Sequence, residues 1–315
     1  MWAWRFLMAC VARGDTRRFN RNPIDSVDYA LDLDYVGDGT RSHRLDVIAP
    51  RRKAGESPPA LPVYIYFHGG GWTSGDKAPL TKYCASQAVE GMVVVNVNYR
   101  KATRFQMRHI LSDADAALSW VLCEIARYGG DPERIVLGGD SAGGQIAALL
   151  AAATRDSELA DHYGIAPTAE IRGVVQHCSV VDFSVIQERG FVMSLNFVRM
   201  LLPARGRGLV LADAIRFLSP IEWIGPTFPP VFVSTSQQDF LYGANLNFMR
   251  RLRAVGVRVD SLVYSSKAKN TRHTWQQDSH LPESQEVYRR LQTFVRRVAV
   301  PSNSPGLSRY AIRRR

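Results

Sequence analysis

The hexapeptide Gly139-Asp140-Ser141-Ala142-Gly143-Gly144 constrains the fold of this chain more than any other segment. The β-branched run 134–137 precedes it, and the helix-forming run 145–151 follows it. A buried strand, a tight turn with a serine at its tip and a helix together expose the hydroxyl as a nucleophile. Glycine is needed two positions before and two after Ser141, because a side chain there would clash where the strand folds back into the helix. A Rossmann-type phosphate turn is disfavoured, since there is no G-x-G-x-x-G and no acidic residue follows at about 20 positions.

Strand and helix patterns alternate over most of the 315 residues. Two near-continuous apolar runs, 62–67 and 92–97, are typical of central strands covered on both faces. This alternation predicts one α/β domain over 1–315 with a mostly parallel sheet and helices on both faces. Further strands are expected at 27–36, 44–48, 174–175, 231–233 and 259–264, and further helices at 110–125, 246–255 and 284–298.

Three segments stand outside this alternation. Residues 183–220 read as helices without a central strand, and an insertion there would lie over the carboxyl ends of the strands, where ligands bind in such sheets. We expect this segment to form a helical cap, although an ordinary helical core is the alternative. Residues 1–24, before the first strand, also lie outside the alternation. Residues 300–315 are expected to be a basic tail.

The net charge of +11 is concentrated at the two ends of the chain. Residues 1–24 and 289–315 carry +12 between them, so the sequence between them sums to −1. A neutral body with basic ends does not resemble a nucleic-acid-binding domain with a basic face. We therefore expect no nucleic-acid partner.

The four cysteines and the amino-terminal residues bear on the compartment. No C-x-x-C pair is present, and three of the cysteines lie in apolar stretches, so reduced core thiols and a cytoplasmic location are expected. Residues 1–10 are apolar but interrupted by Arg5, which does not fit a signal peptide. Membrane association through this segment is the alternative. No run in the sequence approaches the about 20 apolar residues of a spanning helix.

A serine needs a base, an orienting acid and N–H donors for the oxyanion before it can act as a nucleophile. The donor loop is His68-Gly69-Gly70-Gly71-Trp72, directly after the apolar run 62–67. The N–H groups of Gly70 and Gly71 are the expected donors, together with that of Ala142. His68 is expected to brace this loop.

The acid and the base are sought on turns after later strands. Asp239 follows the run 231–236 and is the expected acid, with Asp182 and Asp260 as rivals. His273 follows the last strand and is the expected base, with His280 as its rival. The order Ser141, Asp239, His273 is that of the α/β-hydrolases.

At these residues the chain resembles the hormone-sensitive-lipase and bacterial carboxylesterase group of α/β-hydrolases, over roughly residues 27–298. His68 to Trp72 and Gly139 to Gly144 match the two motifs of that group, and 98–100 and 128–132 match its connecting sequences. Two positions depart from it: Phe240 stands where the group has proline, and Trp275 where it has phenylalanine. These changes bear on specificity.

The resemblance implies two-step acyl transfer to Ser141 with no metal or cofactor. It also implies a cap built from residues 183–220 and 1–24. The expected function is a carboxylesterase acting on small-molecule esters with short-to-medium acyl groups. An arylformamidase-like amidase and a sugar-ester (feruloyl or acetyl-xylan) esterase are alternatives, as is a catalytically silent binding module on the same scaffold. No integral membrane segment is expected, and a homodimer is left open.

Overall fold

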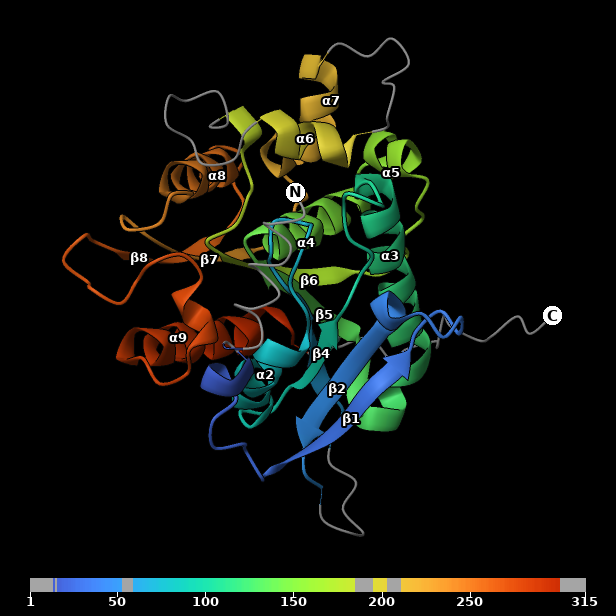
Figure 1. Cartoon of the computed structure of the whole chain (residues 1–315), viewed down its shortest axis with the longest axis vertical. Coiled ribbons are helices and arrows are strands. Elements are labelled where there is room, and N and C mark those ends of the chain that lie inside the picture. Colours follow the sequence, from blue (N-terminus) through green and yellow to red (C-terminus); the bar gives the residue numbers. More distant parts are fainter. Residues whose placement is uncertain (1–13, 15, 53–58, 185–194, 203–210, 301–315) are drawn as a thin grey trace.

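A twisted sheet of eight strands runs through the chain (Figure 1), in the order β1-β2-β4-β3-β5-β6-β7-β8. The computed structural model describes residues 14, 16–52, 59–184, 195–202 and 211–300. Strand β2 pairs antiparallel with β1 and β4, and every other pair is parallel. The strands are β1 (Val27–Asp34), β2 (Arg44–Pro50), β3 (Leu61–Phe67), β4 (Val93–Val97), β5 (Gly130–Asp140), β6 (Ile171–His177), β7 (Val231–Ser236) and β8 (Val259–Tyr264).

Helices cover both faces of the sheet, as the sequence predicts. On one face α2 (Thr81–Ala88) and α9 (Pro282–Val298) enclose one hydrophobic core. On the other face α3 (Met107–Glu124), α4 (Ala142–Ala153), α5 (Ser157–Tyr163) and α8 (Tyr242–Ala254) enclose the larger core. Short 3-10 helices connect these elements: η1 (Arg41–His43), η2 (Ala78–Leu80), η3 (Ile125–Tyr128), η5 (Pro220–Trp223) and η6 (Trp275–Gln277).

Burial explains the sequence patterns of the strands. Every residue of β4 and all but the first of β3 are buried, because helices lie over both of their faces. Strand β1 is at the sheet edge, where only Val27 is buried and the other residues are half-buried or exposed, and its register shifts between Ala30 and Leu33. The near-continuous apolar runs therefore mark central strands, whereas the edge strand is mostly accessible.

Strand β5 begins earlier than the apolar run at 134–137 indicates. Gly129 ends η3 in the left-handed conformation, with φ of 84°. Gly130 then pairs in parallel with Leu61, and the register shifts before Val63 pairs with Ile135. Pairing with β3 thus extends the strand through the polar residues 130–134, which the apolar run does not reveal.

Two helices of the expected cap lie within the described residues. They are α6 (Leu195–Leu201) and α7 (Leu211–Leu218), at the top of Figure 1. Phe217 accepts a hydrogen bond at its carbonyl from the hydroxyl of Tyr163, at 2.8 Å, which ties α7 to α5. Residues 1–13, 15, 185–194, 203–210 and 301–315 lie outside the described residues, and so do the parts of the cap and tail predictions that fall on them.

The cysteines within the described residues lie in two environments. Cys84 and Cys178 are buried free thiols, as expected. Cys123 is also a free thiol but lies exposed on the solvent side of α3, so it is not a core thiol. Within the described residues, no helix is long and apolar enough to cross a membrane.

Candidate active site

Ser141 stands at a strained turn between β5 and α4. Its φ of 51° and ψ of −118° are rare for a residue with a side chain. The turn demands the glycines on either side: a Cβ on Gly139 would lie 2.4 Å from the backbone of Gly143. A Cβ on Gly143 would lie 2.0 Å from the carbonyl oxygen of Phe67. The chain therefore folds back closely enough on β3 to push the serine side chain outward at the carboxyl end of the sheet.

Three side chains from distant parts of the sequence meet at this turn. The Nε2 atom of His273 lies 3.0 Å from the Oγ atom of Ser141. Its Nδ1 atom lies 2.8 Å from the Oδ1 atom of Asp239. Asp239 follows β7 with no exposed side-chain surface, whereas the imidazole of His273, in the loop after β8, is 28% exposed. Sequence reasoning and structure thus bring the same serine, aspartate and histidine together.

The rival residues bind elsewhere. The carboxylate of Asp182 accepts hydrogen bonds from Ser184 and Asn247. Asp260 pairs with Arg297 on α9. His280 is exposed and bonds to Asp278, two residues before it. None of these three side chains contacts Ser141 in the described structure.

The glycine loop, residues 68–72, follows β3 and lies beside the serine turn. Gly70 and Gly71 both have positive φ, 117° and 58°. The carbonyl of Gly70 points back into its own loop, where it accepts bonds from the N–H and the hydroxyl of Ser74. Among the described residues, the N–H groups of Gly70, Gly71 and Ala142 donate to no backbone or side-chain acceptor. Three N–H groups next to Ser141 are therefore available to an oxyanion.

His68 braces the glycine loop. Its ring stacks on Tyr99 with centroids 4.5 Å apart, and the hydroxyl of Tyr99 donates to the carbonyl of His68 at 2.6 Å. Its Nδ1 atom lies 2.7 Å from the carbonyl oxygen of Gly69. Burial lowers the pKa of His68 from 6.5 to about 3, so the ring is neutral. A buried, neutral histidine bonded to its own loop fits the bracing role expected from the sequence.

Both positions that depart from the group's pattern lie beside the histidine. The ring of Phe240 packs against the imidazole of His273, with centroids 4.3 Å apart. Trp275 is buried two residues further on and contacts the ring of Tyr264 edge-on. Phe240 therefore shields one side of the imidazole with an apolar surface.

Two polar side chains beneath the site, those of Asp140 and Gln277, were not predicted from the sequence. Asp140, the residue before the serine, is buried and accepts hydrogen bonds from Tyr66, Gly69 and Gln277. Gln277 ends η6, four residues after His273. Asp140 stands at a variable position of the G-x-S-x-G pattern, and only its acidic side chain in an apolar context could have signalled a buried carboxylate.

A thiol also lies close to the aspartate and the histidine. The ligand atoms of Cys178, Asp239 and His273 lie within 4.8 Å of one another, a spacing that could hold a metal ion. However, Asp239 Oδ1 and His273 Nδ1 already form a 2.8 Å contact with each other. Burial raises the pKa of the Cys178 thiol, which disfavours the thiolate that a metal would require.

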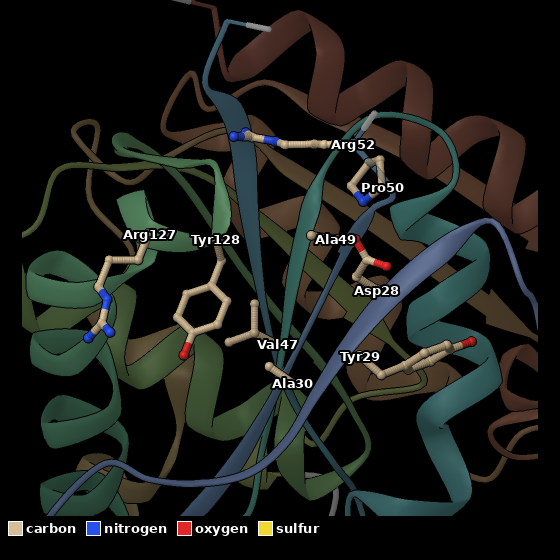
Figure 2. Close-up of a pocket in the computed structure, with 9 residues that line it drawn as sticks. All are labelled: Asp28, Tyr29, Ala30, Val47, Ala49, Pro50, Arg52, Arg127 and Tyr128. Carbon is tan, nitrogen blue, oxygen red and sulfur yellow. The ribbon is translucent and has the colours of Figure 1, made fainter. Parts of the chain in front are cut away.

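A pocket of about 230 Å³ lies elsewhere, between the first two strands and η3 (Figure 2). Arg127 and Tyr128, the η3 residues that line it, lie just before the amino end of β5, whereas Ser141 follows the carboxyl end of that strand. The pocket is therefore at the opposite end of the sheet from the serine. Its lining residues are Asp28, Tyr29, Ala30, Val47, Ala49, Pro50, Arg52, Arg127 and Tyr128.

A Ser-His-Asp array with free N–H donors on an eight-stranded α/β sheet is the site architecture of α/β-hydrolases. The chain belongs to this family: the family model described as alpha/beta hydrolase fold matches residues 64–272.

Two mycobacterial proteins are similar in sequence. The chain is 31% identical over 216 residues to the probable carboxylic ester hydrolase LipM of Mycobacterium tuberculosis, covering 68% of this chain and 49% of that protein. It is 43% identical over 208 residues to the carboxylesterase NlhH of the same species, covering 64% of this chain and 63% of that protein. The chain therefore spans about half of the first relative's length.

Solved structures share the fold over nearly the whole chain. Esterase B from Lactobacillus rhamnosis superposes with a TM-score of 0.83 at 22% identity, covering 94% of both chains. A hyperthermophilic esterase from Pyrobaculum calidifontis has a TM-score of 0.69 at 23% identity, covering 94% of this chain and 93% of that one. At these identities the likeness concerns the fold.

Proposed function

We propose that this protein hydrolyses carboxylic esters, with Ser141 as nucleophile, His273 as general base and acid, and Asp239 as the orienting carboxylate. The observation that carries the proposal is the continuous chain of contacts from Asp239 through His273 to Ser141, at 2.8 and 3.0 Å. The relatives named carboxylic ester hydrolase and carboxylesterase support the choice of an ester bond.

In the first step the hydroxyl oxygen of Ser141 attacks the ester carbonyl carbon while its proton passes to Nε2 of His273. The N–H groups of Gly70, Gly71 and Ala142 bind the oxyanion of the tetrahedral intermediate. When the intermediate collapses, the C–O bond to the alcohol breaks and His273 gives the proton to the departing alcohol.

In the second step water attacks the acyl-serine carbonyl and His273 takes one of its protons. The new tetrahedral intermediate collapses to the carboxylic acid, and the proton returns to the oxygen of Ser141. Asp239 keeps the imidazole in the tautomer with hydrogen on Nδ1 and stabilises the imidazolium. The residues supply every proton transfer, so the proposed reaction uses no metal or cofactor.

We propose short-to-medium acyl esters as substrates, because the ring of Phe240 supplies apolar surface beside His273 and the sequence 183–220 is rich in apolar residues. A cytoplasmic location is also proposed, on the cysteine usage alone.

The test is a series of p-nitrophenyl esters from acetate to palmitate, with N-formylkynurenine as an amide substrate. We expect maximal kcat/KM at short or medium chain lengths and a loss of about 10⁶ in kcat for Ser141→Ala, because the three residues act as a unit. Cleavage of the formamide alone would favour an arylformamidase, and a preference for feruloyl or acetyl-xylan esters a sugar-ester esterase. Turnover of none of them by the wild-type protein would favour a binding module.

A further inference from the structure

Asp140 is a buried carboxylate that the proposed reaction does not use. Its Oδ1 atom accepts hydrogen bonds from the hydroxyl of Tyr66, at 2.7 Å, and from the N–H of Gly69, at 3.0 Å. Its Oδ2 atom accepts one from the side-chain amide of Gln277, at 2.9 Å. All three partners donate, so the site is built for an acceptor, which is what the ionised carboxylate is.

Two of these donors belong to different parts of the active site. Gly69 immediately precedes Gly70 and Gly71 in the glycine loop. Gln277 closes the turn that carries His273, and Asp140 itself is bonded directly to Ser141 in the chain. Tyr66 differs from the other two, since it lies in β3 within the core and carries no active-site group.

We propose that Asp140 is a positioning residue that holds the glycine loop and the histidine turn at fixed distances from Ser141. This inference rests on the proposed function, because Asp140 acts through the donors of the glycine loop and through His273. Oxyanion donors stabilise a transition state only when they are already in place, and a misplacement of about 1 Å can cost on the order of 10²-fold in rate.

The contacts are tight as well as numerous. A Cβ on Gly69 would lie 2.3 Å from the Oδ2 atom of Asp140, so the loop backbone is in direct contact with the carboxylate. Burial raises the pKa of Asp140, and the hydrogen bonds from Tyr66, Gly69 and Gln277 work in the opposite direction. The three donors thus stabilise the ionised form of the carboxylate, and the carboxylate in turn holds the glycine loop and the histidine turn, which carry two of the donors.

Replacing Asp140 by asparagine keeps the shape but reverses the polarity of one atom. If the amide oxygen accepts from Tyr66 and Gly69, the amide nitrogen faces the side-chain amide of Gln277, which must turn over and accept through its oxygen to keep the hydrogen bond. Even with the Gln277 amide turned over, the hydrogen bonds to the glycine loop and to the histidine turn lose their charge-assisted character, so both segments are held less firmly. The double change Asp140→Asn with Gln277→Glu restores a charge-assisted hydrogen bond with its direction reversed and keeps the net charge.

The experiment compares Asp140→Asn, Asp140→Asn/Gln277→Glu, Gln277→Leu and Tyr66→Phe with the wild type. Tyr66→Phe is the matched control, because it removes a donor from the same carboxylate without touching either loop. The readouts are kcat and KM on the best p-nitrophenyl ester, Ki for a trifluoromethyl ketone that forms a tetrahedral adduct, and the rate of labelling by a fluorophosphonate.

For Asp140→Asn we expect kcat and the labelling rate to fall about 10- to 100-fold, KM to stay within about threefold, and Ki to rise about as much as kcat falls. The double variant should recover most of the lost kcat, and Tyr66→Phe should stay within about threefold of the wild type. Gln277→Leu changes a half-buried residue and should lose about 5- to 10-fold in kcat. If Asp140→Asn does not fold, Gln277→Leu tests the positioning role in its place, and wild-type kcat in that variant would overturn it.

Wild-type kcat and Ki in Asp140→Asn, an equal loss in Tyr66→Phe, or a double variant no better than the single one would overturn the positioning role. Failure of the proposed function looks different: the wild-type protein would then neither cleave esters nor take up the fluorophosphonate at Ser141.

Discussion

His177 offers a quantitative test of how the core responds to acid. It ends β6 inside the core, with no exposed surface. Its Nδ1 atom lies 2.6 Å from the hydroxyl of Ser234 and its Nε2 atom 2.8 Å from that of Tyr83. Burial lowers the pKa of His177 from 6.5 to about 3. The folded protein therefore keeps this imidazole neutral over a range in which the unfolded chain protonates it.

The sign of the effect follows from proton binding. Between pH 6.5 and about 3 the unfolded chain binds a proton at His177 that the folded chain does not, so stability falls as the pH falls through this window. At pH 5 the unfolded-state pKa lies 1.5 units above the pH, and each unit corresponds to about 1.4 kcal/mol. Lowering the pH from 7 to 5 should thus cost about 2 kcal/mol at this residue alone.

The assay is urea unfolding at pH 7 and pH 5 for the wild type, His177→Gln and His280→Gln. The variant at 177 loses packing at both pH values, so that cost cancels when each protein is compared with itself. The loss of unfolding free energy between the two pH values should be about 2 kcal/mol smaller in His177→Gln than in the wild type. The exposed His280 controls for the loss of an imidazole. An equal pH dependence in His177→Gln and the wild type would refute the reasoning.

Three further outcomes follow from the site. Gly143→Ala should lower kcat more than about 100-fold and destabilise the fold by about 1–3 kcal/mol, because its Cβ meets the Phe67 carbonyl. Kinetics and urea unfolding measure the two effects, and wild-type kcat would contradict the requirement for glycine at this turn. Asp239→Asn should lower kcat by about 10⁴, because its carboxylate contacts His273. Asp182→Asn should change kcat less than about threefold, because its carboxylate is bonded to Asn247 instead. The reverse ranking in a kinetic assay would exchange the roles of the two aspartates. Dialysis against EDTA should leave kcat unchanged, and a loss restored by added zinc would instead implicate the Cys178 thiol and its neighbours as ligands.

The sequence was informative where local geometry demands particular residue types. The turn around Ser141 admits only glycine at 139 and 143, because the neighbouring backbone leaves no room for a Cβ. The apolar runs of β3 and β4 report strands with both faces covered. Asp239 and His273 could be named because turns after parallel strands meet at one edge of a sheet.

What could not be predicted depends on contacts between distant segments. The bonds of Asp140 to Gly69 and Gln277 span 71 and 137 residues, and no local pattern encodes them. The polar start of β5 is a strand only because Gly130 pairs with Leu61. Likewise, the exposure of Cys123 depends on which side of α3 faces solvent, which its apolar neighbours in the sequence do not reveal.

The most direct test of the central claim is the site of covalent labelling. The protein is incubated with a fluorophosphonate, digested and mapped by mass spectrometry, with Ser141→Ala and His273→Ala treated alongside. The proposed mechanism predicts a single adduct on the oxygen of Ser141, none in Ser141→Ala and much slower labelling in His273→Ala. An adduct on another residue, or labelling of Ser141 that is as fast without His273, would contradict it.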